Sequence, residues 1–142
     1  MQGSVGKELL SAQSWSGSGT VLVVDDEEVV RESLREMLEL MGFIAWLAVD
    51  GDQAFSTWSS TQGRLRAMIL DWNMPGMSGV EVFEKIREVD PDMPIILTSA
   101  YKPDEQIMAL RAQGNLIFLR KPFTMSALRH ALKQQLEQHQ SA

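Results

Sequence analysis

Five short apolar runs, each followed by a segment of helical periodicity, constrain the fold of this chain more than any other feature of its sequence. The first run, residues 21–24, is continuous rather than alternating, and such runs are typical of strands buried on both faces of a sheet. Apolar residues then recur at helical spacing until Gly42, which ends the helix. The same order repeats along the chain, and we expect the other four strands at 44–48, 67–70, 95–97 and 116–119, each with a helix after it.

Strands that alternate with helices predict a parallel sheet with helices on both faces. Because the crossover connections of such a sheet are right-handed, the expected fold class is α/β, a doubly wound parallel sheet. The length of 142 residues fits one domain, and an apolar content of 44% is enough for a core. We expect a flexible tail or linker rich in Gly and Ser at 1–19, the folded domain at 20–138 and a short tail at 139–142.

The composition excludes several classes of function. With 13 basic and 19 acidic residues the formal net charge is −6, which argues against direct binding of nucleic acid. The absence of cysteine excludes disulfides, zinc–thiolate centres, iron–sulfur clusters and thiol catalysis. No apolar run reaches the ~18 residues of a membrane helix, and the N-terminus has no signal-peptide core. We therefore expect a soluble, cytoplasmic domain that makes no contact with a membrane.

Acidic residues stand at the ends of two of the predicted strands. Asp25 and Asp26 follow the first apolar run, and Asp71 follows the third. Because sites in an open parallel sheet form at the carboxyl ends of the strands, these three carboxylates should meet at one edge. Acids at close range repel one another and need a positive charge between them. A hard divalent cation with oxygen ligands, Mg²⁺, is the cofactor that this set predicts.

Polar residues of other kinds end the fourth and fifth strands. Thr98 and Ser99 close the fourth apolar run, and Lys121 follows the fifth. Lys121 brings a second positive charge to the same edge, directed at an anion, and either hydroxyl can donate a hydrogen bond to that anion. A site with Mg²⁺, a lysine and a hydroxyl around a carboxylate suits phosphoryl transfer to that carboxylate.

Four stretches of the sequence resemble the motifs of a known family: VLVVDDEE at 21–28, DWNMPGMSG at 71–79, ILTSAY at 96–101 and KPF at 121–123. With them the chain resembles the receiver domain of two-component response regulators, over residues 20–137. The resemblance implies a flavodoxin-like (βα)5 sandwich, in which a five-stranded parallel sheet of order 2-1-3-4-5 is flanked by five helices. The expected folded domain is then a receiver domain.

The resemblance also implies roles for individual residues. Asp71 matches the phosphoacceptor aspartate. Asp26 matches the acid that binds Mg²⁺ directly, and Asp25 matches its neighbour, which usually acts through water. Asn73 matches the position whose backbone carbonyl completes the metal site, and Lys121 matches the lysine that pairs with the phosphoryl group.

The family's switch residues can be assigned in the same way. For the hydroxyl, the family pattern selects Ser99 over Thr98, because a small residue follows it and Lys121 lies 22 positions later. Phe118, three residues before the lysine, matches the aromatic switch position. A cis peptide bond is implied between Lys121 and Pro122. After phosphorylation the hydroxyl is expected to move toward the phosphoryl group and the ring to turn inward.

The function that the resemblance implies is a signalling module rather than an ordinary turnover enzyme, although such a module assists its own phosphorylation and dephosphorylation. The expected phosphoryl donor is a histidine kinase or a histidine phosphotransfer domain. The output goes to a downstream protein partner or to an attached kinase domain, and the Ser- and Gly-rich lead-in favours a receiver of a hybrid kinase over a single-domain regulator. We expect a monomer or weak dimer. The expected output surface comprises the fourth helix, the fifth strand and the fifth helix, with Ile107, Arg111, Phe118 and Arg129.

Two other functions compete with this one. An aspartyl-phosphate phosphatase of the haloacid dehalogenase type needs a second aspartate two residues after the nucleophile as acid and base, and here that position is Asn73. A pseudo-receiver would be a binding module that is never phosphorylated. Failure to bind Mg²⁺ or to react with a phosphoryl donor would favour the pseudo-receiver.

Overall fold

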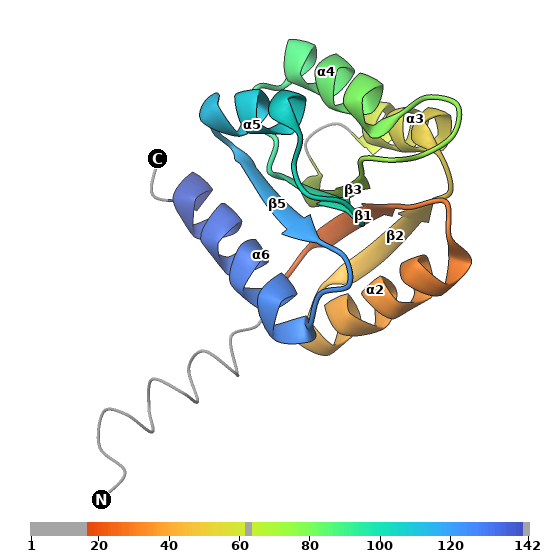
Figure 1. Ribbon diagram of the computed structural model, residues 1–142. Coiled ribbons are helices and arrows are strands. Elements are labelled where there is room, and N and C mark those ends of the chain that lie inside the picture. The colour runs from red at the N-terminus through yellow and green to blue at the C-terminus, as the bar shows by residue number, and fades with distance from the viewer. Residues whose placement is uncertain (1–16, 62–63, 141–142) are drawn as a thin grey trace, which may run out of the picture.

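The computed structural model describes residues 17–61 and 64–140 and contains five strands that alternate with helices (Figure 1). The elements follow in the order β1 (Thr20–Val24), α2 (Glu28–Met41), β2 (Ile44–Ala48), α3 (Gly51–Thr61), β3 (Leu65–Asp71), α4 (Gly79–Val89), β4 (Ile95–Ser99), α5 (Glu105–Ala112), β5 (Leu116–Arg120) and α6 (Met125–Gln140). Most of the predicted tail at 1–19, and residues 141–142, lie outside the described residues, so the predicted domain boundaries stay predictions.

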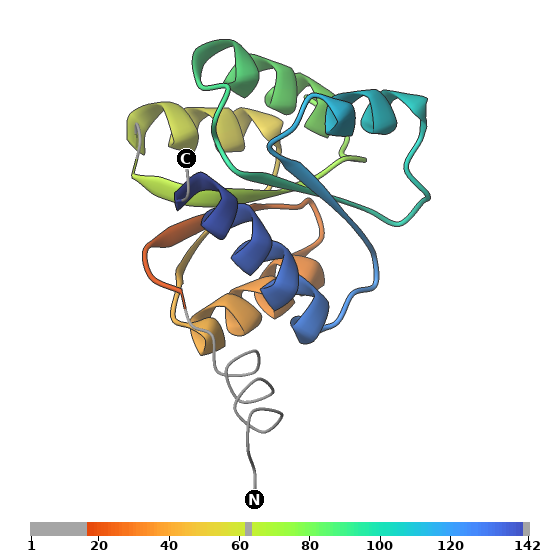
Figure 2. The ribbon, with the colours of Figure 1, turned by 90° about the vertical axis from the view of Figure 1, so that its left-hand side faces the viewer.

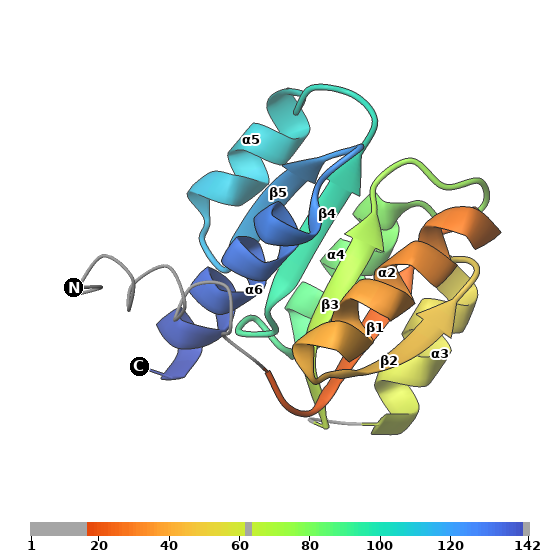
Figure 3. The same cartoon turned by 90° about the horizontal axis from the view of Figure 1, so that it is seen from below.

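The five strands form one parallel sheet of order β2-β1-β3-β4-β5, which confirms the predicted doubly wound fold. Figure 3 shows the strands side by side in this order, with α6 and α2 on the near face. Strand β1 has β2 on one side and the central strand β3 on the other. The carboxyl ends of β1 and β3 are therefore neighbours, as the prediction of a shared site requires.

Helices cover both faces of the sheet, and each face has its own apolar cluster (Figure 2). Within β1, Leu22 and Val24 belong to the cluster under α3, α4 and α5, whereas Val21 and Val23 belong to the cluster under α2 and α6. All four side chains are buried, because successive residues of a strand point to opposite faces and both faces are covered. Burial on both faces therefore explains why residues 21–24 form a continuous apolar run in the sequence.

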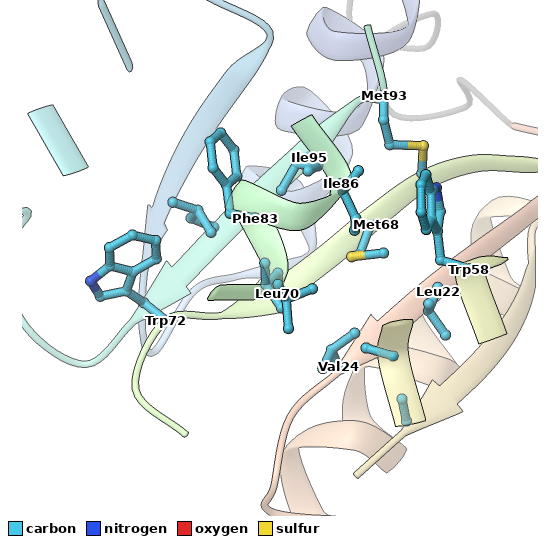
Figure 4. Packing of buried hydrophobic residues seen from close by; sticks show 14 of the residues in the cluster. Leu22, Val24, Trp58, Met68, Leu70, Trp72, Phe83, Ile86, Met93 and Ile95 are labelled. Atoms are coloured by element: carbon cyan, nitrogen blue, oxygen red, sulfur yellow. The ribbon is translucent and has the colours of Figure 1, made fainter. Parts of the chain in front are cut away.

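The cluster on the α3–α4–α5 side extends along the whole sheet toward the site. Figure 4 shows its buried side chains, with Trp58 and Met93 at one end and Trp72 at the other. Trp72 directly follows the end of β3 and is buried, although its neighbour Asn73 is exposed. A buried indole contributes a large apolar area, so Trp72 fixes the chain where it leaves the strand next to Asp71.

Local hydrogen bonds mark where three of the helices begin or end, and Gly42 ends its helix as predicted. Gly42 has φ 102° and ends α2 in the left-handed conformation, with its N–H donating to the carbonyls of Glu39 and Leu38. Asp104 caps α5 by accepting from the N–H of Ile107 at 2.8 Å. The hydroxyl of Thr124 accepts from the N–H of Ala127 at 3.0 Å in the first turn of α6. In the part of the chain that the structure describes, no helix combines the length and apolar character needed to cross a bilayer.

β3 and β4 extend furthest beyond the predicted runs, whereas β1 and β5 are each one residue longer than predicted. β3 begins at Leu65, two residues before the expected start, since Leu65 is buried and pairs with Thr20. The polar Arg66 interrupts the apolar run and concealed this extension. β4 continues through Thr98 and Ser99, which are buried despite their hydroxyls. Both extensions add polar residues at strand ends, where apolar runs alone do not mark the boundary.

Candidate functional site

Three carboxylates meet at the carboxyl edge of the two central strands. Asp25 and Asp26 follow β1, Asp71 is the last residue of β3, and one oxygen of each lies within 4.8 Å of the others. Asp25 and Asp71 are only 1% and 3% exposed, whereas Asp26 is exposed. The predicted cluster is therefore present, with two acids buried in the sheet edge and the third open to solvent.

Lys121 reaches this cluster from the end of the edge strand β5. Its Nζ donates to Asp25 Oδ2 at 2.7 Å and lies 3.5 Å from Asp71 Oδ2. The backbone helps to place it, because the Lys121 N–H donates to the Ser99 carbonyl at 2.7 Å. The peptide bond between Lys121 and Pro122 is cis, as the resemblance implied. The ammonium expected to face an anion thus lies between two carboxylates of the protein itself.

The cluster is short of positive charge even with this lysine. Burial, and then the charge of Asp25, raise the pKa of Asp71 from 3.8 to about 6, against the opposing effects of Lys121 and the Asn73 N–H. Burial also disfavours the charged form of Lys121. The hydrogen bond to Asp25 and the charge of Asp71 outweigh it and raise the pKa of the ammonium above its usual value. A further cation among these oxygens would relieve the repulsion.

The loop after β1 is held by contacts that the sequence did not reveal. The N–H of Glu27 donates to Asp25 Oδ1 at 2.9 Å, and Arg31 Nη1 donates to the Asp25 carbonyl at 2.8 Å. Because Lys121 occupies the other carboxylate oxygen, both oxygens of Asp25 have a donor. The buried carboxylate is thereby fixed in orientation, and the exposed Asp26 is the member of the pair that is open to a ligand.

A close backbone approach brings α4 to the end of β3. A Cβ atom on Gly79 would lie 2.4 Å from the Asp71 carbonyl oxygen and 2.8 Å from the Trp72 Cα. Ser78, just before it, caps the helix by accepting from the N–H of Glu81 at 3.3 Å. Only glycine allows this approach, so Gly79 sets where the chain carrying Asp71 meets the helix.

Ser99 and Asn73 are linked directly. The Ser99 hydroxyl donates to Asn73 Oδ1 at 2.7 Å and accepts from the Tyr101 N–H at 3.1 Å. The Asn73 N–H in turn donates to Asp71 Oδ1 at 3.2 Å. The neighbouring Thr98 is buried, and its carbonyl accepts from the Trp72 N–H at 2.8 Å. Of the two candidate hydroxyls, Ser99 is the one bonded to the loop that follows Asp71.

An open cavity of about 170 Å³ lies beside Asp71. Since a water molecule takes about 30 Å³ of liquid, this space has room for a small oxyanion next to the carboxylate. A basic group, Lys121, lines it together with acidic and polar ones. The residues around it are Glu27, Asp71, Asn73, Ala100, Tyr101 and Lys121.

The residues expected to form the switch and the output surface differ in their exposure, and their roles stay predictions. Phe118 on β5 is partly buried and packs against the cluster under α3, α4 and α5. Arg111 is exposed and Arg129 half-buried. The placement of Ile107 on an output surface is wrong, because this residue is 1% exposed and packs into the core. Its neighbour Met108, 58% exposed, is the apolar side chain that α5 presents to solvent.

Comparison with protein families gives one match that covers most of the chain. The model of the response regulator receiver domain matches residues 21–133. This region contains every carboxylate of the cluster, as well as Lys121 and both candidate hydroxyls.

Curated relatives are proteins of several kinds. The chain is 32% identical over 131 residues to sensor kinase CckA of Brucella abortus, covering 92% of this chain and 14% of the relative. It is 41% identical over 112 residues to transcriptional regulatory protein PrrA of Mycobacterium tuberculosis, covering 78% and 47%. With sporulation initiation phosphotransferase F of Bacillus subtilis, identity is 30% over 116 residues, covering 82% and 92%. The chain thus spans less than half the length of the first two.

Solved structures match over nearly their full length. The structure of response regulator protein TrrA from Thermotoga maritima, in complex with Mg(2+)-BeF, is 34% identical with a TM-score of 0.73, covering 83% of this chain and 99% of that one. The receiver domain of hybrid histidine kinase CckA is 29% identical with a TM-score of 0.70, covering 83% and 99%.

Proposed function

This chain belongs to the response regulator receiver domain family, and on that premise we propose that Asp71 is its phosphoacceptor and that a phosphohistidine of a histidine kinase or histidine phosphotransfer domain is the donor. The observation that carries the proposal is the convergence of Asp25, Asp26 and Asp71 within 4.8 Å, with the Lys121 ammonium between two of them. Of the three carboxylates, Asp71 is the one that lines the cavity.

The transfer step follows from these positions. An oxygen of the Asp71 carboxylate forms a bond to phosphorus as the phosphorus–nitrogen bond of the donor breaks, and the donor imidazole keeps the electron pair. The phosphoryl group then occupies the cavity beside Asp71. Lys121, now divided between Asp25 and Asp71, gains a charge-assisted partner in the phosphoryl oxygens. Its position in the unphosphorylated domain holds the positive charge ready for the anion.

The residues present fit Mg²⁺. The donor set consists of carboxylate oxygens and a backbone carbonyl, which suit a hard cation. Burial, and then the charge of Asp25, raise the pKa of Asp71, so a cation beside this carboxylate would favour its ionised form. We assign Asp26, Asp71 and the Asn73 carbonyl as ligands, with Asp25 acting through water. When bound, Mg²⁺ offsets the negative charge shared by the carboxylate and the phosphoryl oxygens. Asp25, held by Lys121 and the Glu27 N–H, orients this set.

Receiver domains are signalling phosphoacceptors, and we propose that this one passes its signal through α5, β5 and α6. Ser99 and Phe118 would couple the phosphoryl group to this surface, because Ser99 ends the strand next to β5 and Phe118 pairs with Leu97 on that strand. The receiving partner is a downstream protein or an attached kinase domain. The cytoplasmic location and the absence of ordinary turnover stay predictions. No observation favours a dehalogenase-type phosphatase, since Asn73 carries an amide that accepts from Ser99 rather than an acid.

Labelling with a small phosphoryl donor tests the assignment. The protein is incubated with Mg²⁺ and acetyl phosphate, and intact mass spectrometry measures the phosphorylated fraction. The wild type and Asp52→Asn, a change at an exposed acid on α3, should both be labelled, whereas Asp71→Asn should not. If Asp71→Asn is labelled as well as the wild type, the assignment is wrong. Absence of label on the wild type would favour the pseudo-receiver.

A further inference from the structure

The Ser99 hydroxyl is already fully engaged in the unphosphorylated domain. It donates its proton to Asn73 Oδ1 at 2.7 Å, and its oxygen accepts from the Tyr101 N–H at 3.1 Å. Ser99 is only 2% exposed, so this geometry is set by the protein rather than by solvent. The bond joins the loop after β3 to the last residue of β4, 26 positions further along the chain.

A serine hydroxyl has one proton, and it can be donated to only one strong acceptor at a time. For Ser99 to donate to a phosphoryl oxygen on Asp71, its bond to Asn73 must therefore break. We propose that the Asn73 side chain is a latch on the unphosphorylated state: a positioning residue that competes with the phosphoryl group for the Ser99 hydroxyl and so sets how readily the domain switches. This inference rests on the proposed function, in which Asp71 is phosphorylated.

Asn73 is suited to this role because its backbone and side chain act separately. Its N–H donates to Asp71 Oδ1 at 3.2 Å, and its carbonyl is assigned to the metal, so both backbone groups serve the acceptor site. The side-chain amide oxygen instead accepts the hydrogen bond from the Ser99 hydroxyl. Asn73 is exposed, in contrast to its buried neighbours Trp72 and Met74. Truncation to alanine therefore removes the competing acceptor with little loss of packing.

The latch also reaches the loop after β4. Because the Tyr101 N–H donates to the Ser99 oxygen, movement of the hydroxyl changes the hydrogen bond of this amide. Tyr101 and Ala100 both line the cavity beside Asp71. The Tyr101 amide is thus a reporter of the latch that can be observed without phosphorylation.

The test is a double-mutant cycle of Asn73→Ala and Ser99→Ala, measured as affinity for beryllofluoride at saturating Mg²⁺. A hydrogen bond of this kind has a net value that corresponds to about a 2- to 12-fold change in an equilibrium constant. Asn73→Ala should therefore bind beryllofluoride about 2- to 12-fold more tightly than the wild type. In the Ser99→Ala background the same change should have no effect, because there is no hydroxyl to release. Affinity for Mg²⁺ is measured separately in each variant, so that beryllofluoride binding is always compared at saturating Mg²⁺.

NMR supplies a second measurement, which should not change if the Asn73 side chain has only a structural role. In Asn73→Ala without beryllofluoride, the Tyr101 amide resonance should shift part of the way toward its position in the beryllofluoride-bound wild type. Unchanged or weaker binding of beryllofluoride by Asn73→Ala overturns the latch, and so does an equal gain in the Ser99→Ala background. If the wild type binds no beryllofluoride, the proposed function is wrong, and the latch with it. If the wild type binds beryllofluoride but Asn73→Ala changes neither the affinity nor the Tyr101 resonance, the latch alone is wrong.

Discussion

Neutralising Asp71 should stabilise the metal-free domain. Burial and the charge of Asp25 raise the pKa of Asp71, so the ionised carboxylate is held in the fold at a cost. Asp71→Asn keeps the shape of the side chain but cannot ionise. Lys121 does not lose its main partner in this variant, because its shorter contact is the 2.7 Å bond to Asp25. The variant that abolishes phosphorylation should thus be the more stable protein.

The size and sign of the effect follow from the two pKa values. The pKa of Asp71 rises from 3.8 to about 6 on folding, and at 1.36 kcal/mol per pH unit this corresponds to about 3 kcal/mol. Because the pKa of Asp71 is higher in the folded state than in the unfolded state, protonated Asp71 stabilises the fold at low pH. This contribution to the free energy of unfolding is lost as pH rises from about 4 through 6. Above pH 6 the wild type is destabilised by the full amount, because Asp71 is then ionised in the folded domain. For a domain of this size, about 3 kcal/mol shifts the midpoint of thermal unfolding by about 6–12 °C.

Urea unfolding in the presence of EDTA, followed by tryptophan fluorescence, measures the difference. At pH 7.5 the free energy of unfolding of Asp71→Asn should exceed that of the wild type by up to about 3 kcal/mol, and the gap should narrow toward pH 4.5. Asp52→Asn, at an exposed position on α3, serves as the control and should show no such trend. Added Mg²⁺ should narrow the gap at pH 7.5 by stabilising the wild type. A variant less stable than the wild type at pH 7.5, or a gap that does not change with pH, would refute this reasoning.

Three other changes test separate parts of the site. Asp26→Ala should weaken Mg²⁺ binding, followed by tryptophan fluorescence, more than Asp25→Ala does, because the exposed Asp26 is the proposed direct ligand; equal losses would contradict this. Lys121→Ala should leave Mg²⁺ affinity within about threefold of the wild type but weaken beryllofluoride binding by tenfold or more. The reason is that hydrogen bonds to charged groups contribute about 1.5–3 kcal/mol. A selective loss of Mg²⁺ affinity would argue against the role of Lys121 with the phosphoryl group. Gly79→Ala should destabilise the domain by about 1–3 kcal/mol in thermal unfolding, because its Cβ would lie 2.4 Å from the Asp71 carbonyl oxygen; wild-type stability would show that α4 moves aside freely.

The edge of the sheet that holds the site could be predicted because it depends on topology alone. Once the order of strands and helices is known, residues that end parallel strands must meet, and Asp25, Asp71 and Lys121 do so. Which atoms touch could not be predicted in this way. The bond from Ser99 to Asn73 depends on the exact path of the loop after β3 relative to the end of β4, and no residue pattern at 73 or 99 marks it.

Helix faces could be predicted from apolar spacing, but not where a buried face carries a polar group. In α5 the spacing of Ile107 and Leu110 is typical of inward-facing side chains, and Ile107 is buried, so its inclusion in the output surface went against its own spacing. In α6 the spacing of Leu128, Leu132 and Leu136 marked the buried face correctly. Gln135 lies on that face too and is fully buried, with Nε2 donating to the Ile95 carbonyl at 3.3 Å and to the Asn115 carbonyl at 2.8 Å. A polar residue whose partners come from distant loops looks like a solvent-facing residue in the sequence.

The site and the core of this domain make opposite demands on the same strands. β1 and β3 bury apolar side chains on both faces almost completely, which is the largest favourable contribution that a strand can make. Their carboxyl ends hold Asp25 and Asp71 buried and close together, which is unfavourable until a cation arrives. Lys121 relieves part of this repulsion, but it is shared between the two acids and leaves the pKa of Asp71 raised. In the proposed function, the unfavourable burial of these acids gives Mg²⁺ its affinity for the edge. The property that lowers the stability of the metal-free domain is then the same one that the proposed phosphoacceptor site needs.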